Sequence, residues 1–273
     1  MTLGRRLRGL ALACHAPPTV GVTGVMTVFA WSLGWSGGSL VLVAVTILVG
    51  QLSVGWSNDA FDSALDAHAA RATKPTVAGD VSPRLLWSAA IIALIASVPL
   101  SVLVAGVVGG SFHLLALGMA WLYNLRLSRT VWSWLPYAVA FAAAPPFLTF
   151  GLDGQAPPLW MVAAFALIAV SAHLANALPD LETDRAARLG GLAVRLGARA
   201  SVRLCWLLLA VGSVVIAVAM AERSLVLAGV LLVIPVAAEE VAWRRGRPST
   251  MFHALLAVAA LDVIAIAVLP ALD

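Results

Sequence analysis

The feature that most limits how this chain can fold is a series of apolar segments, each close in length to a bilayer crossing. A membrane-spanning helix needs about 20 mostly apolar residues. Inside lipid the backbone polar groups have no water to bond, and a helix satisfies them within its own segment. The sequence therefore predicts an all-α membrane protein with nine transmembrane helices, in which residues 1–273 form a single domain. The expected helices cover residues 17–36, 38–56, 85–107, 110–124, 131–151, 157–178, 201–220, 224–242 and 250–270.

The composition agrees with a membrane environment. Hydrophobic residues make up 62% of the 273 residues and charged residues only 11%. These are too few polar groups to cover the surface of a soluble domain of this length. The shortest expected connection lies between the third and fourth helices, where Gly109 and Gly110 are expected to form a tight turn.

The basic residues predict which way the helices cross the membrane. Cytoplasmic loops of membrane proteins are enriched in Lys and Arg. If the N-terminus is cytoplasmic, all of the 17 Lys and Arg residues except Arg223 fall on that side. We therefore expect the protein in the cytoplasmic (plasma) membrane, with its active site on the cytoplasmic side. The net charge of +4 follows from this asymmetry. It does not indicate a nucleic-acid partner, because the basic residues are spread over short loops without interleaved aromatics.

A first acidic cluster ends the second expected helix, in the stretch NDAFDSALD. Its three aspartates are spaced so that a helix with about 3.6 residues per turn places them on one face. Like charges at this spacing repel each other, so a cation should compensate them. Carboxylate and amide oxygens suit Mg²⁺, which often bridges to the phosphates of a substrate. The expected metal ligands are Asn58, Asp59, Asp62 and Asp66, and the expected substrate contacts are Asn58 together with Arg71 and Lys74 behind the cluster.

A second acidic cluster ends the sixth expected helix, in the stretch NALPDLETDRAARLGG. Its members are four residues apart and are expected on one helix face. An even number of helices separates the two clusters, so both open on the same side of the membrane. The expected metal ligands are Asn176, Asp180 and Asp184, and the expected substrate contacts are His173, Asn176, Arg185 and Arg195.

The two clusters predict a receptor for a polyanion next to an apolar cavity. A molecule with a diphosphate head and a hydrocarbon tail meets both requirements. Mg²⁺ and the basic side chains would stabilise the departing diphosphate and leave an allylic carbocation in a pocket that excludes water. The predicted function is therefore Mg²⁺-dependent transfer of a prenyl group from a polyprenyl diphosphate to a lipophilic acceptor, expected to be aromatic. The expected catalytic carboxylates are Asp59, Asp62, Asp66, Asp180 and Asp184.

At these residues the sequence resembles the UbiA superfamily of intramembrane prenyltransferases. The family pattern N-D-x-x-D-x-x-x-D is matched from Asn58, and the pattern D-x-x-x-D is matched by DLETD from Asp180. The stretch GGLAVRLGARAS after the second motif is similar to the loop at that place in the family. The resemblance implies nine helices around a central cavity with a cytoplasmic-side cap, and Mg²⁺-dependent use of a polyprenyl diphosphate.

The sequence departs from the family pattern at two places. The family often has a tyrosine and a lysine between the fourth and fifth helices that contact the diphosphate. Here YNLRLSRT supplies Tyr123 but no lysine. Either Arg126 or Arg129 replaces that lysine as a substrate contact, or both are ordinary cytoplasmic charges. Near the first helix, His15 precedes the Pro pair where the family often has an Arg.

Two other functions fit parts of the pattern. A terpene cyclase on the same scaffold would ionise the same diphosphate and let the chain's own double bond capture the cation. A transporter for a phosphorylated isoprenoid would need charges or broken helices near the middle of the membrane, whereas the acids here cluster at one face. The prenyl chain length, the acceptor and the oligomeric state are not readable from the sequence.

Overall fold

The computed structural model describes residues 2–68, 74–186, 190–245 and 248–268, which form helices joined by turns, with no β-strand among them. Arg71, one of the predicted substrate contacts, lies outside these residues. In chain order the helices are α1 (Leu3–Ala13), α2 (Ala16–Ser32), α3 (Gly37–His68), α4 (Pro83–Leu122), η1 (Tyr123–Leu127), α5 (Trp134–Ala142), α6 (Ala144–Leu152), α7 (Leu159–Ala177), α8 (Leu181–Ala186), α9 (Leu192–Leu196), α10 (Ala198–Ala221), α11 (Leu225–Arg245) and α12 (Pro248–Val268).

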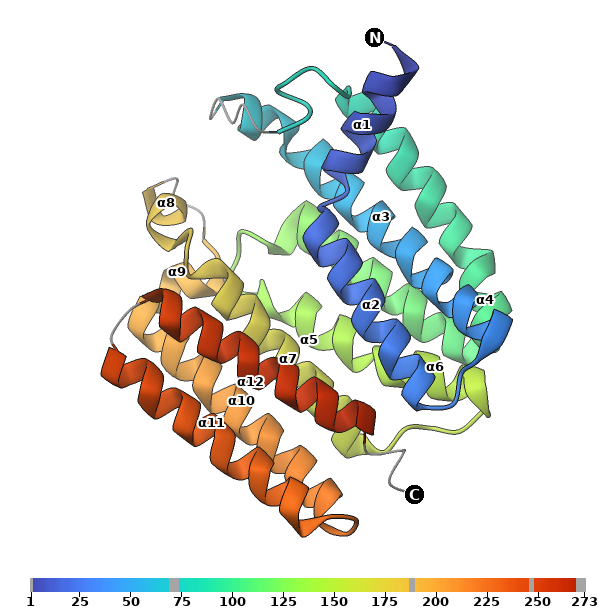
Figure 1. The fold of residues 1–273 in the computed structure, drawn as a ribbon. Coiled ribbons are helices and arrows are strands. Elements are labelled where there is room, and N and C mark those ends of the chain that lie inside the picture. Colours follow the sequence, from blue (N-terminus) through green and yellow to red (C-terminus); the bar gives the residue numbers. More distant parts are fainter. Residues whose placement is uncertain (1, 69–73, 187–189, 246–247, 269–273) are drawn as a thin grey trace.

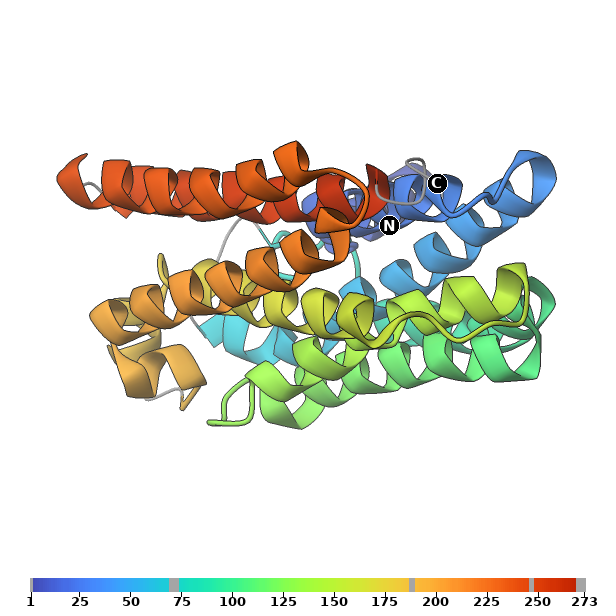
Figure 2. The ribbon, with the colours of Figure 1, turned by 90° about the horizontal axis from the view of Figure 1, so that it is seen from below.

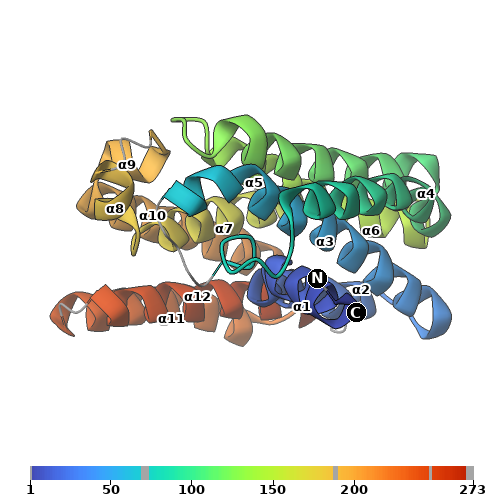
Figure 3. The same ribbon diagram turned by 90° about the horizontal axis from the view of Figure 1, so that it is seen from above.

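The long helices follow one another around a ring (Figure 1). Helix α3 packs on α2 and α4, helix α7 packs on α5 and α10, and α12 contacts α2 as well as α7. The last helix therefore closes the ring against the second. Seen from below and from above, α3 and α7 lie between a layer with α4 and α5 and a layer with α2 and α12 (Figure 2 and Figure 3). The short helices α8 and α9 lie together at one end of the bundle (Figure 1).

Apolar side chains cover outer faces of this bundle. Ile92, Leu103, Val107 and Val218 are 67%, 70%, 75% and 68% exposed, as expected of side chains that face lipid rather than water. Six of the described helices are long and apolar enough to cross a membrane, or seven if α1 and α2, bent by 63°, count as one span. The chain is therefore a multi-pass integral membrane protein. The count of nine spans and the cytoplasmic N-terminus stay predictions.

Helix α4 contains a sharp break at Ala105 and Gly106, whose backbone leaves the helical conformation. Ser101 Oγ lies 2.7 Å from His113 Nδ1 across this break. A straight helix would place two residues twelve positions apart about 18 Å from each other. The two limbs of α4 therefore fold back on one another as a helical hairpin, which accounts for the third and fourth predicted helices.

The predicted turn at Gly109 and Gly110 is wrong by a few residues, and the reason is physical. Gly106 takes the left-handed backbone angle that the turn needs, with φ of 63°. Gly110 is instead helical and buried, and a Cβ atom there would lie 2.8 Å from the carbonyl oxygen of Ser101. Its small size lets the two limbs approach closely, as at other membrane-helix contacts.

This contact predicts a difference between two glycines of the same limb. Gly110→Ala should destabilise the fold by about 1–3 kcal/mol, because the added methyl group overpacks the hairpin. Gly118→Ala should be neutral or slightly stabilising, since nothing lies within 4 Å of a Cβ atom at that position. Thermal unfolding in detergent compares the two variants. Equal midpoints would contradict the close packing of the hairpin.

Candidate functional site

The three aspartates of the first acidic cluster all lie on α3, because this helix continues to His68 beyond its apolar part. Asp59 and Asp66 are buried, with 2% and 1% of their surface exposed, and Asp62 is partly exposed. A buried carboxylate is costly unless it is paired. The surroundings of these side chains therefore show what the site is built to hold.

A buried asparagine holds the π-helical turn η1 against the first cluster. Asn58 Nδ2 donates to Asn124 Oδ1 (3.2 Å), and Asn124 Nδ2 donates to Ser57 Oγ (2.9 Å). Asn124 is 5% exposed. Asn124 was not predicted as a site residue, because it belongs to no metal or phosphate motif. The signal available was a polar residue next to Tyr123 at the end of an apolar run, and π-helical turns are frequent at functional sites.

Two basic side chains bond the same oxygen of Asp59. Lys74 Nζ donates to Asp59 Oδ1 at 2.6 Å, and His15 Nε2 lies 2.7 Å from that oxygen. Lys74 follows Asp59 by 15 residues, whereas His15 comes from 44 residues earlier in the chain. Lys74 therefore contacts the first cluster, and its role as a substrate contact stays a prediction. His15, which departs from the family pattern, had no predicted role at this site.

His15 is held in an unusual backbone conformation. It lies between α1 and α2, with φ of 53° and ψ of 59°, and no other described residue except glycine has a positive φ. This left-handed conformation costs a residue with a Cβ atom about 1–2 kcal/mol. Such strain persists where the surrounding structure enforces it, often at functional sites. Here it turns the chain by 63° between α1 and α2 and brings the imidazole to Asp59.

The second aspartate is paired with the segment after η1. Arg129 Nη2 donates to Asp62 Oδ1 at 2.7 Å, and the same guanidinium lies 5.7 Å from the centre of the Phe61 ring. Arg126 is exposed on η1. Of the two arginines considered for the missing family lysine, Arg129 is thus the one in contact with the first cluster.

Tyr123 lies near both acidic clusters. The carboxylates of Asp62 and Asp184 both lie close enough to interact electrostatically with its hydroxyl group. Its ring meets the ring of Tyr137 edge-on at 5.2 Å and that of His173 at 5.8 Å. Residues from α3, α5, α7 and α8 therefore surround Tyr123 of η1.

His173 links this place to the polypeptide beyond the second cluster. A hydrogen bond of 3.0 Å joins His173 Nε2 to Ser133 Oγ, and the rings of His173 and Tyr137 are 4.4 Å apart. The Ser133 hydroxyl also accepts a bond from the backbone N–H of Leu192 (3.1 Å). Ser133 and Tyr137 were not predicted, because each gains its role only through contacts with distant residues.

The second acidic cluster is less regular than its spacing predicted. Asn176 lies on α7, which ends at Ala177, and Asp184 lies on α8. Asp180 is in the turn between them, after Pro179, and its backbone carbonyl accepts a bond from Asp184 N–H at 2.8 Å. The continuous helix face predicted for these three residues is therefore interrupted. Asn176 and Asp180 are exposed, as are Arg185 and Arg195.

The acidic side chains are of the type that binds Mg²⁺, but they are not arranged as a complete binding site. Carboxylate and amide oxygens are the hard ligands this ion prefers. Among the described residues, however, no three His, Cys, Asp or Glu side chains are already arranged to hold a metal ion. Asp59 and Asp62 instead bond basic side chains through Oδ1. These oxygen donors fit a metal ion whose remaining ligands are phosphate and water, and they do not form a complete metal site by themselves.

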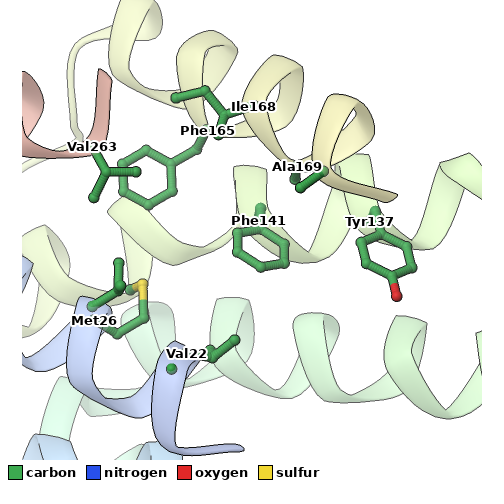
Figure 4. Close-up of a pocket in the computed structure, with 11 residues that line it drawn as sticks. Val22, Met26, Tyr137, Phe141, Phe165, Ile168, Ala169 and Val263 are labelled. Atoms are coloured by element: carbon green, nitrogen blue, oxygen red, sulfur yellow. The ribbon is translucent and has the colours of Figure 1, made fainter. Parts of the chain in front are cut away.

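An apolar pocket of about 210 Å³ adjoins this site (Figure 4). It lies among α2, α5, α7 and α12, and Tyr137, which contacts His173, forms part of its wall. Figure 4 shows Phe141 between Tyr137 and the group formed by Met26, Phe165 and Val263. The Tyr137 hydroxyl is the polar side-chain group in a wall of otherwise apolar side chains. A hydrocarbon chain starting at Tyr123 could thus continue past Tyr137 into this pocket.

Comparison with known proteins identifies the family. The model of the UbiA prenyltransferase family matches residues 19–269. The chain belongs to this family. A solved UbiA homologue from Archaeoglobus fulgidus, bound to DMAPP and Mg²⁺, has a TM-score of 0.68 at 17% identity and covers 98% of both chains. Digeranylgeranylglyceryl phosphate synthase has a TM-score of 0.71 at 13% identity, covering 97% of this chain and 98% of that one. At these identities the two structures show a UbiA-like fold.

A curated relative adds a local match. A lycopene elongase/hydratase from Halobacterium salinarum is 40% identical over 77 residues. The match spans 27% of this chain and 25% of that relative. The resemblance to the UbiA superfamily read from the two motifs is therefore confirmed for the family and the fold.

The strained backbone at His15 yields a prediction about stability. His15→Gly and His15→Ala both remove the imidazole, but only the glycine adopts the left-handed conformation without a Cβ penalty. His15→Gly should therefore be more stable than His15→Ala by about 1 kcal/mol. Paired thermal melts in one detergent measure the difference. If the alanine variant is equally stable or more so, the left-handed turn is not enforced by the fold.

Proposed function

We propose that this protein is a Mg²⁺-dependent intramembrane prenyltransferase, which ionises a polyprenyl diphosphate and transfers the prenyl group to a lipophilic, aromatic acceptor. The observation that carries the proposal is that Tyr123 lies near a carboxylate of each acidic cluster and beside a tyrosine that also lines an apolar pocket. One end of this arrangement suits a metal diphosphate and the other suits a hydrocarbon.

The polar residues would have two roles at the diphosphate, as metal ligands and as contacts to the phosphate oxygens. Mg²⁺, when bound, would neutralise the diphosphate and act as a Lewis acid on the leaving group. Lys74 and Arg129 already lie at the first cluster and would contact the phosphate oxygens, and Arg is well suited to this because of its planar fork of donors. The proposed metal ligands are Asn58, Asp59, Asp62, Asp66, Asn176, Asp180 and Asp184. The remaining proposed substrate contacts are Arg71, Tyr123, Arg126, His173, Arg185 and Arg195.

The pocket supports the second half of the reaction. Loss of the diphosphate leaves an allylic cation that water would capture at once. An apolar wall excludes water, and the rings of Tyr137 and Phe141 offer electron-rich faces to a cation. A lipophilic acceptor would then supply the electron pair that forms the new carbon bond, and its proton would leave afterwards.

We further propose nine spans with a cytoplasmic N-terminus. The α4 hairpin contributes two crossings, and α5 with α6 forms one. Figure 1 places the start of α1 and the end of α12 at opposite ends of the bundle, which an odd number of crossings requires. Helices α8 and α9 lie toward the same end as α1. Both acidic clusters would thus face the cytoplasm of a plasma membrane.

A terpene cyclase is the second candidate. The observation that favours it is the aromatic lining of the pocket by Tyr137, Phe141 and Phe165, because a cyclase must stabilise several successive cations. The same acids would ionise the same diphosphate in either enzyme. The two functions differ in whether an acceptor is needed.

Turnover of prenyl diphosphates tests the proposal. Purified protein is mixed with Mg²⁺ and geranyl, farnesyl or geranylgeranyl diphosphate, with and without a panel of aromatic acceptors, and diphosphate release and product masses are measured. Asp62→Asn should lower turnover by about 100-fold or more, because the substitution removes a negatively charged carboxylate that would bind the Mg²⁺ of the metal diphosphate. Glu222→Gln, an exposed carboxylate between α10 and α11, should retain normal turnover.

The outcomes separate the candidates. Prenylated acceptor that disappears with EDTA and returns with Mg²⁺ supports the transferase. A cyclic product formed without acceptor, and absent in Asp62→Asn, supports the cyclase instead. Near-normal turnover by Asp62→Asn, or turnover that is indifferent to EDTA, would contradict both.

A further inference from the structure

We propose that Gly190 is a positioning residue, which ties the polypeptide after the second acidic cluster to Arg129 and through Arg129 to Asp62. This inference rests on the proposed function, because it concerns how the two clusters are held ready for one diphosphate. It assigns a role to the Gly-Gly pair that follows the second motif, outside both motifs.

Arg129 is bonded to both halves of the site. Its side-chain Nη2 donates to Asp62 Oδ1 at 2.7 Å, on the first cluster. Its backbone carbonyl oxygen accepts a bond from the N–H of Gly190 at 3.1 Å, on the segment that follows the second cluster. A displacement of the Gly190 segment therefore acts on Arg129, and a displacement of Arg129 acts on the Asp62 carboxylate.

A second bond fixes the same two segments. The backbone N–H of Leu192 donates to Ser133 Oγ at 3.1 Å, and this hydroxyl is also bonded to His173 Nε2 at 3.0 Å. The segment of residues 190–192 is thus attached at both ends to the turn of residues 129–133. His173 lies on α7, the helix that leads into the second cluster.

The fit at position 190 requires a residue without a side chain. A Cβ atom on Gly190 would lie 2.7 Å from the Arg129 carbonyl oxygen, the same atom that accepts its hydrogen bond. That oxygen belongs to the backbone and cannot move alone. At Gly191 a Cβ atom would lie 3.4 Å from the Ser128 carbonyl oxygen, which is close to ordinary contact. The backbone φ of Gly191 is −54°, so this neighbour does not need glycine for its conformation either.

This pair of glycines provides a matched test in the full-length protein. Gly190→Ala should lower kcat for prenyl diphosphate turnover by about 10- to 100-fold, because misplacement of reacting groups by about 1 Å has effects of this size. The KM should change much less, and the thermal midpoint should fall less than that of Gly110→Ala, because Gly190 lies in a connection between helices and not at a helix contact. Gly191→Ala should match the wild type in all three measurements.

A distance measurement isolates the positioning role from activity. Spin labels at Leu65→Cys on α3 and Glu182→Cys on α8 report the separation of the segments that carry the two clusters, and both positions are exposed. Gly190→Ala should shift or broaden the distance distribution, whereas Gly191→Ala should leave it unchanged. Ser133→Ala, which removes the bonds to Leu192 and His173 without adding bulk, should also broaden the distribution and replaces Gly190→Ala if that variant does not fold.

The results decide between the inference and the function on which it rests. If Gly190→Ala and Ser133→Ala both keep the wild-type distance distribution, the tie does not position the clusters and the inference is overturned. If the distribution changes as expected but the wild type turns over no prenyl diphosphate, the tie stands and the proposed function fails. A loss of kcat in Gly191→Ala equal to that in Gly190→Ala would also overturn the role assigned to Gly190.

Discussion

The pairing of buried carboxylates with basic side chains is the constraint on which the rest of this structure depends. Asp59 is almost wholly buried at the end of a membrane helix, where an unpaired charge is strongly unfavourable. It is neutralised by Lys74 from the segment that follows α3, and its Oδ1 also lies within hydrogen-bond distance of His15 from the junction of α1 and α2. Asp62, which is partly exposed, forms an ion pair with Arg129. These pairs bring together parts of the chain that are far apart in sequence.

The same ion pairs compensate the charges of these carboxylates before substrate binds, so the polar site does not destabilise the unbound protein. Replacing a protein cation by a metal diphosphate keeps each carboxylate compensated, so binding need not leave a buried charge uncovered. Tyr123 and Tyr137 then separate this ionic region from the apolar pocket, since one ring lies near Asp62 and Asp184 and the other lines the pocket. Under the proposed function, the bond between the prenyl carbon and the diphosphate would break at the boundary between these two environments.

Sequence reasoning could predict the features that depend on local spacing. The apolar runs gave the helices, and the aspartate spacing gave a shared face on α3, because both follow from helix geometry. It could not place the turn at Gly106 instead of Gly109, because Gly110 is required by its contact with Ser101 rather than by its own conformation. Nor did the four-residue spacing of the second cluster predict that the helix is interrupted around Pro179, between Ala177 and Leu181.

Contacts between distant segments account for the residues that were missed. Asn124 forms hydrogen bonds with Asn58 and Ser57, which lie 66 and 67 positions earlier in the sequence. Ser133 gains its importance from His173 and Leu192, 40 and 59 positions away. No motif spacing records such pairs. The left-handed conformation of His15 is similar, because it accompanies a contact with Asp59, 44 positions away in the sequence.

The most direct test of the account is a cryo-EM structure of the protein in lipid nanodiscs with Mg²⁺ and an unreactive prenyl thiodiphosphate. The account predicts that the diphosphate lies between the first and second acidic clusters, with metal density against their carboxylates. It also predicts that the prenyl chain passes Tyr137 into the pocket formed with Phe141 and Phe165. A diphosphate held by one cluster alone, or a prenyl chain that avoids this pocket, would contradict it.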